Sequence, residues 1–156
     1  MQITTVSLFE QLAKTILDYY LKGFKTLDNT RPLWTNGLEI DRYYPQLGVA
    51  IEFQGPQHYK QIEAMQTPEK FQNQLRADSL KRQACLGQGI SYLPLPIFSF
   101  SESSYRSTIE QIKNAGTVFA KKNNDITSYN QLSRMLVGKY PDQQIFRRIE
   151  GIKNKR

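Results

Sequence analysis

Apolar residues at helical spacing open the chain. Between residues 4 and 23 they recur on one face, and the run ends at Gly23, which predicts a long amphipathic helix. The apolar positions are Val6, Phe9, Leu12, Ala13, Ile16, Leu17 and Tyr20. Two strand-like runs follow at residues 38–44 and 49–54, and the turn residues "PQLG" between them favour a β-hairpin.

Helix and strand signals alternate through the next part of the chain. Pro68 opens a helical stretch that we expect to close at Gly87 or Gly89, because proline favours the first turn of a helix and glycine its end. Residues 90–98 then form an apolar run whose two prolines limit it to a short strand.

The last part of the chain predicts further helices. Residues 103–122 have helical spacing, with Ser103 or Ser104 as the cap. A polar boundary lies at 121–125, and residues 128–136 and 143–156 predict one or two short helices beyond it. The order helix, hairpin, helix, strand, helix indicates an α/β fold.

The turn fixes which residues of the hairpin should pair. If Pro45 lies opposite Gly48, Tyr44 faces Val49 and paired residue numbers sum to 93. Asp41 would then face Glu52, and Glu39 would face Gln54. Because alternate residues of a strand share a face, these four polar side chains should project from one side. The other side carries the core residues Leu38, Ile40, Val49, Ile51 and Phe53, with Arg42 and Tyr44 nearer the turn.

Three carboxylates on one face of a hairpin need an explanation, because like charges across a strand pair repel. A hard divalent cation such as Mg²⁺ would relieve the repulsion, since it prefers carboxylate and water oxygens. The alternative is a solvated sheet face, where polar and apolar residues alternate routinely. The sequence leaves both interpretations open.

Length and composition point to one ordinary globular domain. The chain has 156 residues, 39% of them hydrophobic, and a single cysteine, Cys85, so no internal disulfide is expected. The N-terminus lacks the basic segment and apolar run of a secretory signal, and no apolar run is long enough to span a membrane. These features favour a cytoplasmic protein with no membrane partner.

Charge adds a first hint about partners. The formal net charge is +7, and a basic surface attracts polyanions by releasing their counterions. Nucleic acid is one such partner. Ribosome-associated and membrane-surface proteins share the same property, so charge alone does not choose between them.

The hairpin residues also resemble a known family. Asp41, followed by "IEFQ" at 51–54 on a hairpin between two helices, is similar to the active site of the PD-(D/E)XK (restriction-endonuclease-like) nucleases. The fuller pattern, from Glu10 to about Leu95, is most like small intron-encoded homing endonucleases. The resemblance implies a restriction-endonuclease-like core, with a mixed β-sheet flanked by helices. Gln54 stands where the family signature has lysine.

The resemblance also implies roles for the hairpin residues. Asp41 would be the central Mg²⁺ ligand, Glu52 the second acid, and the backbone carbonyl of Phe53 a further ligand. Gln54 would position water or phosphate through hydrogen bonds, although it lacks charge. The missing positive charge would come from Lys60 or Lys81, and family analogy favours Lys81. A solvated position on its helix is the alternative for Lys81.

Further candidates lie outside the hairpin strands. Glu10 matches an acid that several members of the family carry on the first helix, but Ser7 to Glu10 also fits a capping box. Glu39 is a substitute acid on the same hairpin face. His58 is either a phosphate-contacting group or a packing residue of its loop.

The basic C-terminus suggests contact with DNA. Residues 1–120 would form the nuclease core, and residues 121–156 a basic extension for assembly or DNA contact. Arg147, Arg148, Lys153, Lys155 and Arg156 would bind phosphates without reading sequence. A self-solvated tail is the alternative.

The implied function is a site-specific, Mg²⁺-dependent endonuclease of the homing type, acting on chromosomal DNA without an organic cofactor. One active site cuts one strand, so a double-strand break requires a homodimer or homotetramer on double-stranded DNA. A Holliday-junction resolvase is an alternative that also carries an acid on its first helix. A non-catalytic DNA-binding module of the same fold is the other, favoured by Gln54.

Overall fold

The structure is a computed structural model that describes residues 5–55 and 67–154, with side chains from Leu8 onward in the first helix. Its elements are α1 (Thr5–Leu21), β1 (Leu27–Thr30), η1 (Leu33–Thr35), β2 (Ile40–Tyr44), β3 (Val49–Gln54), α2 (Pro68–Gly87), β4 (Ser91–Pro96), η3 (Ile97–Phe100), α3 (Tyr105–Lys122), α4 (Ile126–Arg134) and α5 (Gln144–Asn154). The predicted helices, hairpin and short strand are confirmed, and the fold is α/β.

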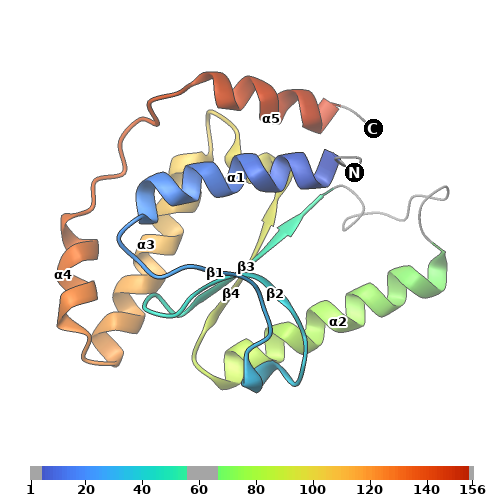
Figure 1. Cartoon of the computed structure of the whole chain (residues 1–156), viewed down its shortest axis with the longest axis horizontal. Coiled ribbons are helices and arrows are strands. Elements are labelled where there is room, and N and C mark those ends of the chain that lie inside the picture. The colour runs from blue at the N-terminus through green and yellow to red at the C-terminus, as the bar shows by residue number, and fades with distance from the viewer. Residues whose placement is uncertain (1–4, 56–66, 155–156) are drawn as a thin grey trace.

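One four-stranded mixed sheet, in the order β1-β2-β3-β4, forms the centre (Figure 1). The strands β1, β2 and β3 are antiparallel, and β4 runs parallel to β3. The helices α1, α3 and α5 contribute to the large core cluster with one face of the sheet, while Cys85 of α2 joins a smaller cluster with Ile40 and Ala50. Helices therefore flank the sheet on both faces.

The strand β1 was not predicted. Its sequence, Leu-Asp-Asn-Thr, has no apolar alternation, and Asn29 adopts a positive φ of 49°. It nevertheless pairs with β2, with Leu27 opposite Tyr43 and Thr30 opposite Ile40. Pairing with a neighbour fixes this strand, because its own side chains do not favour it.

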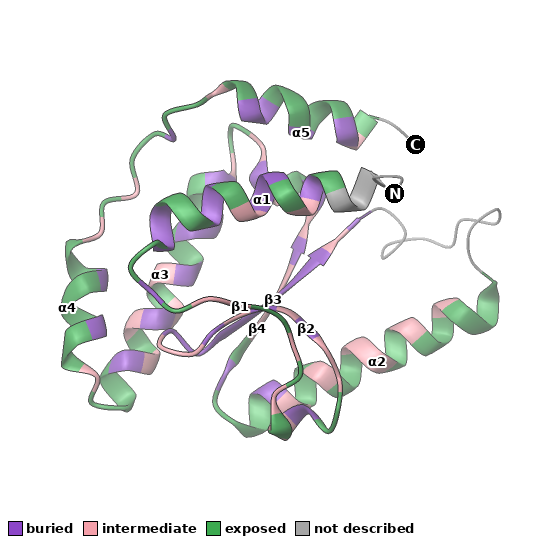
Figure 2. Cartoon of the chain, viewed as in Figure 1, coloured by how far each residue is buried: buried purple, intermediate pink, exposed green. Residues whose placement is uncertain are grey.

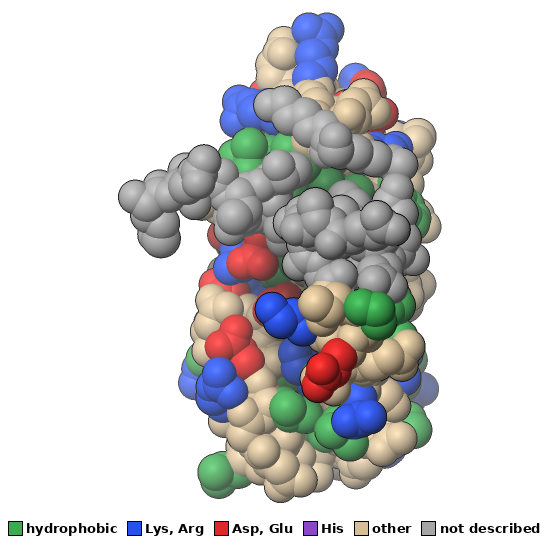
Figure 3. Space-filling model, turned by 90° about the vertical axis from the view of Figure 1, so that its right-hand side faces the viewer, with side chains coloured by type: hydrophobic (Ala, Val, Ile, Leu, Met, Phe, Trp, Pro, Cys, Tyr) green, Lys and Arg blue, Asp and Glu red, His purple; other side chains and the backbone are tan. Residues whose placement is uncertain are grey.

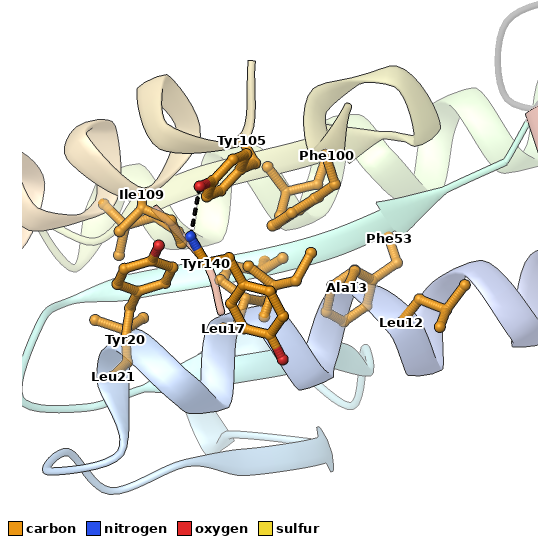
Figure 4. Close-up of a cluster of buried hydrophobic side chains, with 14 of the residues drawn as sticks. Leu12, Ala13, Leu17, Tyr20, Leu21, Phe53, Phe100, Tyr105, Ile109 and Tyr140 are labelled. Atoms are coloured by element: carbon orange, nitrogen blue, oxygen red, sulfur yellow. Dashed lines mark hydrogen bonds between the residues drawn. The ribbon is translucent and has the colours of Figure 1, made fainter. Parts of the chain in front are cut away.

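In the main core, α5 packs against α1 and η3, and α4 against α3 (Figure 2). Figure 4 shows part of this core, around Tyr20, Tyr105 and Tyr140. Apolar residues of α5 lie in the same cluster as those of α1 and β3. The backbone N–H of Tyr140 donates a 2.7 Å hydrogen bond to the hydroxyl of Tyr105, and the hydroxyl of Tyr20 donates one to the Gly138 carbonyl. The segment after Lys121 thus shares the core of the preceding residues.

The predicted turn of the hairpin is confirmed, and its glycine is required. Gly48 has a φ of 58°, a left-handed conformation that glycine adopts without strain. A Cβ atom on Gly48 would lie 2.2 Å from the Phe119 ring. The turn therefore packs directly onto α3. The turn also sets the register of the hairpin, in which Tyr44 pairs with Val49.

Helix α2 differs from the other helices in its burial. Thr67 caps its start by accepting a hydrogen bond from the N–H of Lys70, and the helix ends at Gly87, the first of the two predicted positions. Cys85 is its only buried residue. Figure 1 shows its first turns reaching away from the sheet. Most of α2 is therefore exposed, and only a few of its side chains face the sheet.

A buried arginine ties α1 to the edge of the sheet. Arg42 is 3% exposed, and its guanidinium donates to both carboxylate oxygens of Asp28 at 2.7 and 3.0 Å and to Asp18 at 2.7 Å. These partners raise the pKa of Arg42 despite its burial. The sequence places Arg42 on the core side, and the structure confirms that position.

Removing one partner of Arg42 should destabilise the fold. We expect Asp28→Asn to lower the free energy of unfolding by about 2 kcal/mol, less than for a fully buried pair because the Asp28 side chain is 39% exposed. Urea unfolding measures the change. Glu39→Gln is the matched control, because its pair with Arg31 is exposed and should contribute little. Equal effects of the two substitutions would contradict this role of Arg42.

Candidate active site

The hairpin register agrees with the prediction, but the strand pairing ends early. Tyr44 pairs with Val49, Tyr43 with Ala50 and Arg42 with Ile51, so paired numbers sum to 93. Arg42 and Ile51 form the last pair. Asp41 and Glu52 would form the next pair. At this point hydrogen bonds to side-chain carboxylates replace those of the backbone ladder.

Each of these two acids accepts a hydrogen bond from a backbone N–H group of the hairpin. The N–H of Asp41 donates to Glu52 Oε2 at 2.8 Å, and the N–H of Phe53 donates to Asp41 Oδ2 at 2.9 Å. Backbone N–H groups away from water need partners, and the carboxylates provide them in this partly buried region where the ladder stops. The two acids are therefore held together at the gap between β2 and β3.

A lysine from α2 completes the cluster. Lys81 Nζ donates to Glu52 Oε1 at 2.5 Å, and the side chains of Lys81 and Glu52 are 17% and 6% exposed. Lys81 thus faces the sheet and is not a solvated helix-face residue. Lys60, the other candidate for the missing charge, lies outside the described residues.

The environment of Glu52 opposes its negative charge. Burial is the main cause that raises the pKa of Glu52 to about 7, and repulsion from Asp41 adds to it. The hydrogen bonds from Lys81 and from the Asp41 amide lower the pKa and offset part of this rise. A cation beside Glu52 therefore favours its ionised form.

Tyr92 belongs to the same cluster, although the sequence did not point to it. It pairs with Ala50, which places it on the sheet face that carries Glu52. Burial and the charges of Glu52 and Asp78 raise the pKa of Tyr92. The Arg82 guanidinium lies 5.0 Å from its ring, and its buried hydroxyl has no hydrogen-bond partner in the described part of the chain. The parallel register of β4 brings it here.

The oxygens at the gap fit a hard divalent cation. Asp41 and Glu52 supply two adjacent carboxylates, and Mg²⁺ is often held by one or two carboxylates with waters completing its shell. The carbonyl of Phe53 is directed toward the same gap as its N–H, because the two groups of one strand residue point to the same side. Within residues 5–55 and 67–154 no group of three or more His, Cys, Asp or Glu side chains is placed to hold a metal ion.

Glu10 approaches the end of β3 from the opposite face of the sheet. Its carboxylate accepts a 3.1 Å hydrogen bond from Lys14, and Lys14 Nζ lies 5.7 Å from the centre of the Phe53 ring. Helix α1 begins at Thr5, so Ser7 is inside the helix and the capping-box interpretation is wrong. Gln54 is the last residue of β3, half-buried and two residues beyond Glu52.

Glu39 does not join the acid pair. Its carboxylate accepts hydrogen bonds from Asn29 at 3.1 Å and from Arg31 at 3.5 Å, next to β1. The predicted grouping of three carboxylates is therefore reduced to the pair Asp41 and Glu52, because Glu39 bonds to residues in and after β1 instead. His58 lies outside the described residues.

The basic residues of the C-terminus lie on an ordered helix. Helix α5 buries Ile145, Phe146, Ile149 and Ile152, so it is not a self-solvated tail. Arg147 and Arg148 are exposed, and Arg148 lies 3.9 Å from Asp142. Lys153 lies 3.8 Å from Glu150. Lys155 and Arg156 lie outside the described residues.

The start of α1 and the ends of β3 and α5 lie on the right-hand side of Figure 1, and the start of α2 lies further out on the same side. Figure 3 views this side and shows acidic and basic side chains next to one another, beside the atoms that are not described. Glu10, Gln54 and Lys153 come from these ends. This face therefore combines acids that suit a cation with bases that suit an anion.

Comparisons with known proteins identify no family. No protein-family model and no solved structure matches the chain. A stretch of 60 residues, 38% of the chain, is 40% identical to 30% of the uncharacterized protein 307L of Invertebrate iridescent virus 6. A stretch of 66 residues, 42% of the chain, is 35% identical to 34% of the uncharacterized protein 033L of Invertebrate iridescent virus 3. The chain spans about a third of the length of these curated relatives.

The described helices offer no membrane span. None of those in residues 5–55 and 67–154 combines the length and apolar character that crossing a bilayer requires.

The raised pKa of Glu52 predicts a pH-dependent metal affinity. Between the ordinary carboxyl pKa and about 7, the folded protein holds a proton that a metal must displace. We expect the affinity for Mg²⁺ to rise as pH increases through about 7, by up to about tenfold per unit below that value. The same proton stabilises the metal-free fold in this window, and that stability falls as pH rises through it.

Isothermal titration with Mg²⁺ at several pH values measures this dependence. Glu39→Gln is the control, because that acid pairs with Arg31 and should leave the pH dependence unchanged. An affinity that does not vary between about pH 5.5 and 8 would show that Glu52 does not lose a proton on binding.

Proposed function

We propose that the chain is a metal-dependent endonuclease that hydrolyses DNA phosphodiester bonds with Asp41 and Glu52. The observation that carries the proposal is the meeting of these two carboxylates where the hairpin ladder ends, with Lys81 on Glu52. A hairpin of this kind, between a leading and a following helix in a small mixed sheet, is what the resemblance to PD-(D/E)XK nucleases implies.

Each residue of the cluster has a distinct task in this proposal. Asp41 and Glu52 hold the cation, with the Phe53 carbonyl as a further ligand. Bound Mg²⁺ would lower the pKa of a water and neutralise charge that develops on the phosphate. Gln54, at the end of β3, orients water or phosphate by hydrogen bonds. Lys81 supplies the positive charge that Gln54 lacks, from the helix that faces the acids.

The substrate follows from charge and from the exposed bases. The net charge of +7 favours a polyanion. Arg147 and Arg148 project from α5, and Lys153 lies in its last turn. These residues would bind phosphates on either side of the cut. A homing endonuclease that breaks both strands of duplex DNA would need two or four copies of the chain.

Cleavage of DNA by the parent protein and by Asp41→Asn tests the proposal. The parent, incubated with Mg²⁺ and a random-site library of linear duplexes, should cut, and Asp41→Asn should cut more than about 100-fold more slowly because it loses a carboxylate ligand. Glu110→Gln, an exposed acid on α3, is the matched control and should cut like the parent.

A second substrate separates the alternatives. A four-way junction cut in preference to linear duplex would identify a resolvase, which the acid on α1 favours. Binding of DNA without cleavage of either substrate would identify a non-catalytic module, which Gln54 favours. Equal cleavage by the parent and by Asp41→Asn would rule out these residues as the nuclease site.

A further inference from the structure

The acid pair already binds a positive group of the same protein, the ammonium of Lys81. Both oxygens of Glu52 are engaged, Oε2 by the backbone N–H of Asp41 and Oε1 by the ammonium of Lys81 at 2.5 Å. Lys81 reaches this position from α2, and its side chain is 17% exposed. The ammonium therefore binds Glu52 Oε1, the oxygen that accepts no backbone hydrogen bond from Asp41.

That oxygen is also the one a metal would need. A divalent cation bound between Asp41 and Glu52 would take an outward oxygen from each. Glu52 Oε2 is committed to the Asp41 amide and Asp41 Oδ2 to the Phe53 amide, which leaves Oε1 of Glu52 for the metal. An ammonium and a divalent cation repel at contact distance, so the two compete for one oxygen.

We propose that Lys81 is a built-in substitute for the metal, and that metal binding displaces its ammonium from Glu52 toward the DNA phosphate. This inference rests on the proposed function. The long, flexible side chain of lysine allows the exchange without moving the backbone. Lys81 thus has two positions: on Glu52 without metal, and on the substrate with metal.

The exchange explains how the cluster stays balanced in both states. When both carboxyl groups are ionised, Asp41, Glu52 and Lys81 together carry one net negative charge, and without Lys81 they would carry two. Lys81 lowers the cost of holding two acids together when no metal is present. The released ammonium then supplies charge next to Gln54, at the position where the family signature has its lysine.

Removing Lys81 should strengthen metal binding, although lysines near metal sites are usually retained for function. Lys81→Met removes the competitor and leaves both carboxylates, so it should bind Ca²⁺ and Mg²⁺ at least about tenfold more tightly than the parent, because a like charge has gone. The same variant should cleave DNA more slowly. If Lys81 were a permanent structural partner of Glu52, Lys81→Met would instead bind Ca²⁺ and Mg²⁺ more weakly, because Glu52 would lose its fixed position.

Isothermal titration with Ca²⁺ and Mg²⁺ at about pH 8, above the ordinary range for carboxyl groups, compares three proteins. The parent and Lys81→Met are measured beside Lys70→Met, which removes an exposed lysine from the same helix and controls for net charge. Lys70→Met should match the parent within about twofold, because its charge is exposed to solvent. Equal or weaker binding by Lys81→Met would overturn the proposal.

A measurement on the unaltered protein gives an independent test. The rate of reductive methylation at Lys81, followed by mass spectrometry, should increase when Ca²⁺ is added, because the ammonium leaves its buried position. An unchanged rate with Ca²⁺ bound would also overturn the proposal. If the parent binds metal and cuts DNA but Lys81→Met gains no affinity, this inference fails alone. If the parent binds no divalent cation, the proposed function fails with it.

Discussion

The site depends on one structural constraint, the end of the strand ladder at Arg42 and Ile51. Beyond this pair, the backbone N–H groups of Asp41 and Phe53 donate to the carboxylates of Glu52 and Asp41 instead. These backbone hydrogen bonds in a partly buried setting hold the two acids side by side. The local repulsion between the acids follows from a bonding requirement of the backbone.

The rest of the cluster can be understood as a response to that repulsion. Burial and Asp41 both oppose the charge of Glu52, and Lys81 crosses from α2 to balance it. Most of α2 is exposed, so this inward lysine is one of its few links to the sheet. The positive charge that Lys81 places next to Glu52 can also come from a metal ion. This exchange links the fold to the proposed nuclease chemistry.

Local rules determine the parts of the fold that were predictable from sequence. Pro45 and Gly48 fix the turn, and the turn fixes the pairing of Tyr44 with Val49. The strand β1 and the position of Glu39 were missed because they depend on pairing between segments with little apolar pattern. The acid pair itself could be predicted, since Asp41 and Glu52 lie next in register.

The cationic side of the site was harder to predict. A lysine on a polar helix reads as solvated, and only the packing of α2 on the sheet turns Lys81 toward Glu52. Tyr92 enters the cluster through the parallel register of β3 and β4, for which short sequence patterns give no rule. Contacts between distant segments decided both positions.

The location of a bound metal tests the account most directly. A crystal structure of the protein grown with Mn²⁺, with the ion placed by its anomalous scattering, should show it about 2.1 Å from carboxylate oxygens of Asp41 and Glu52. Lys81 should have left Glu52. A structure that lacks an ion at these residues under saturating Mn²⁺, and retains the bond between Lys81 and Glu52, would contradict the account.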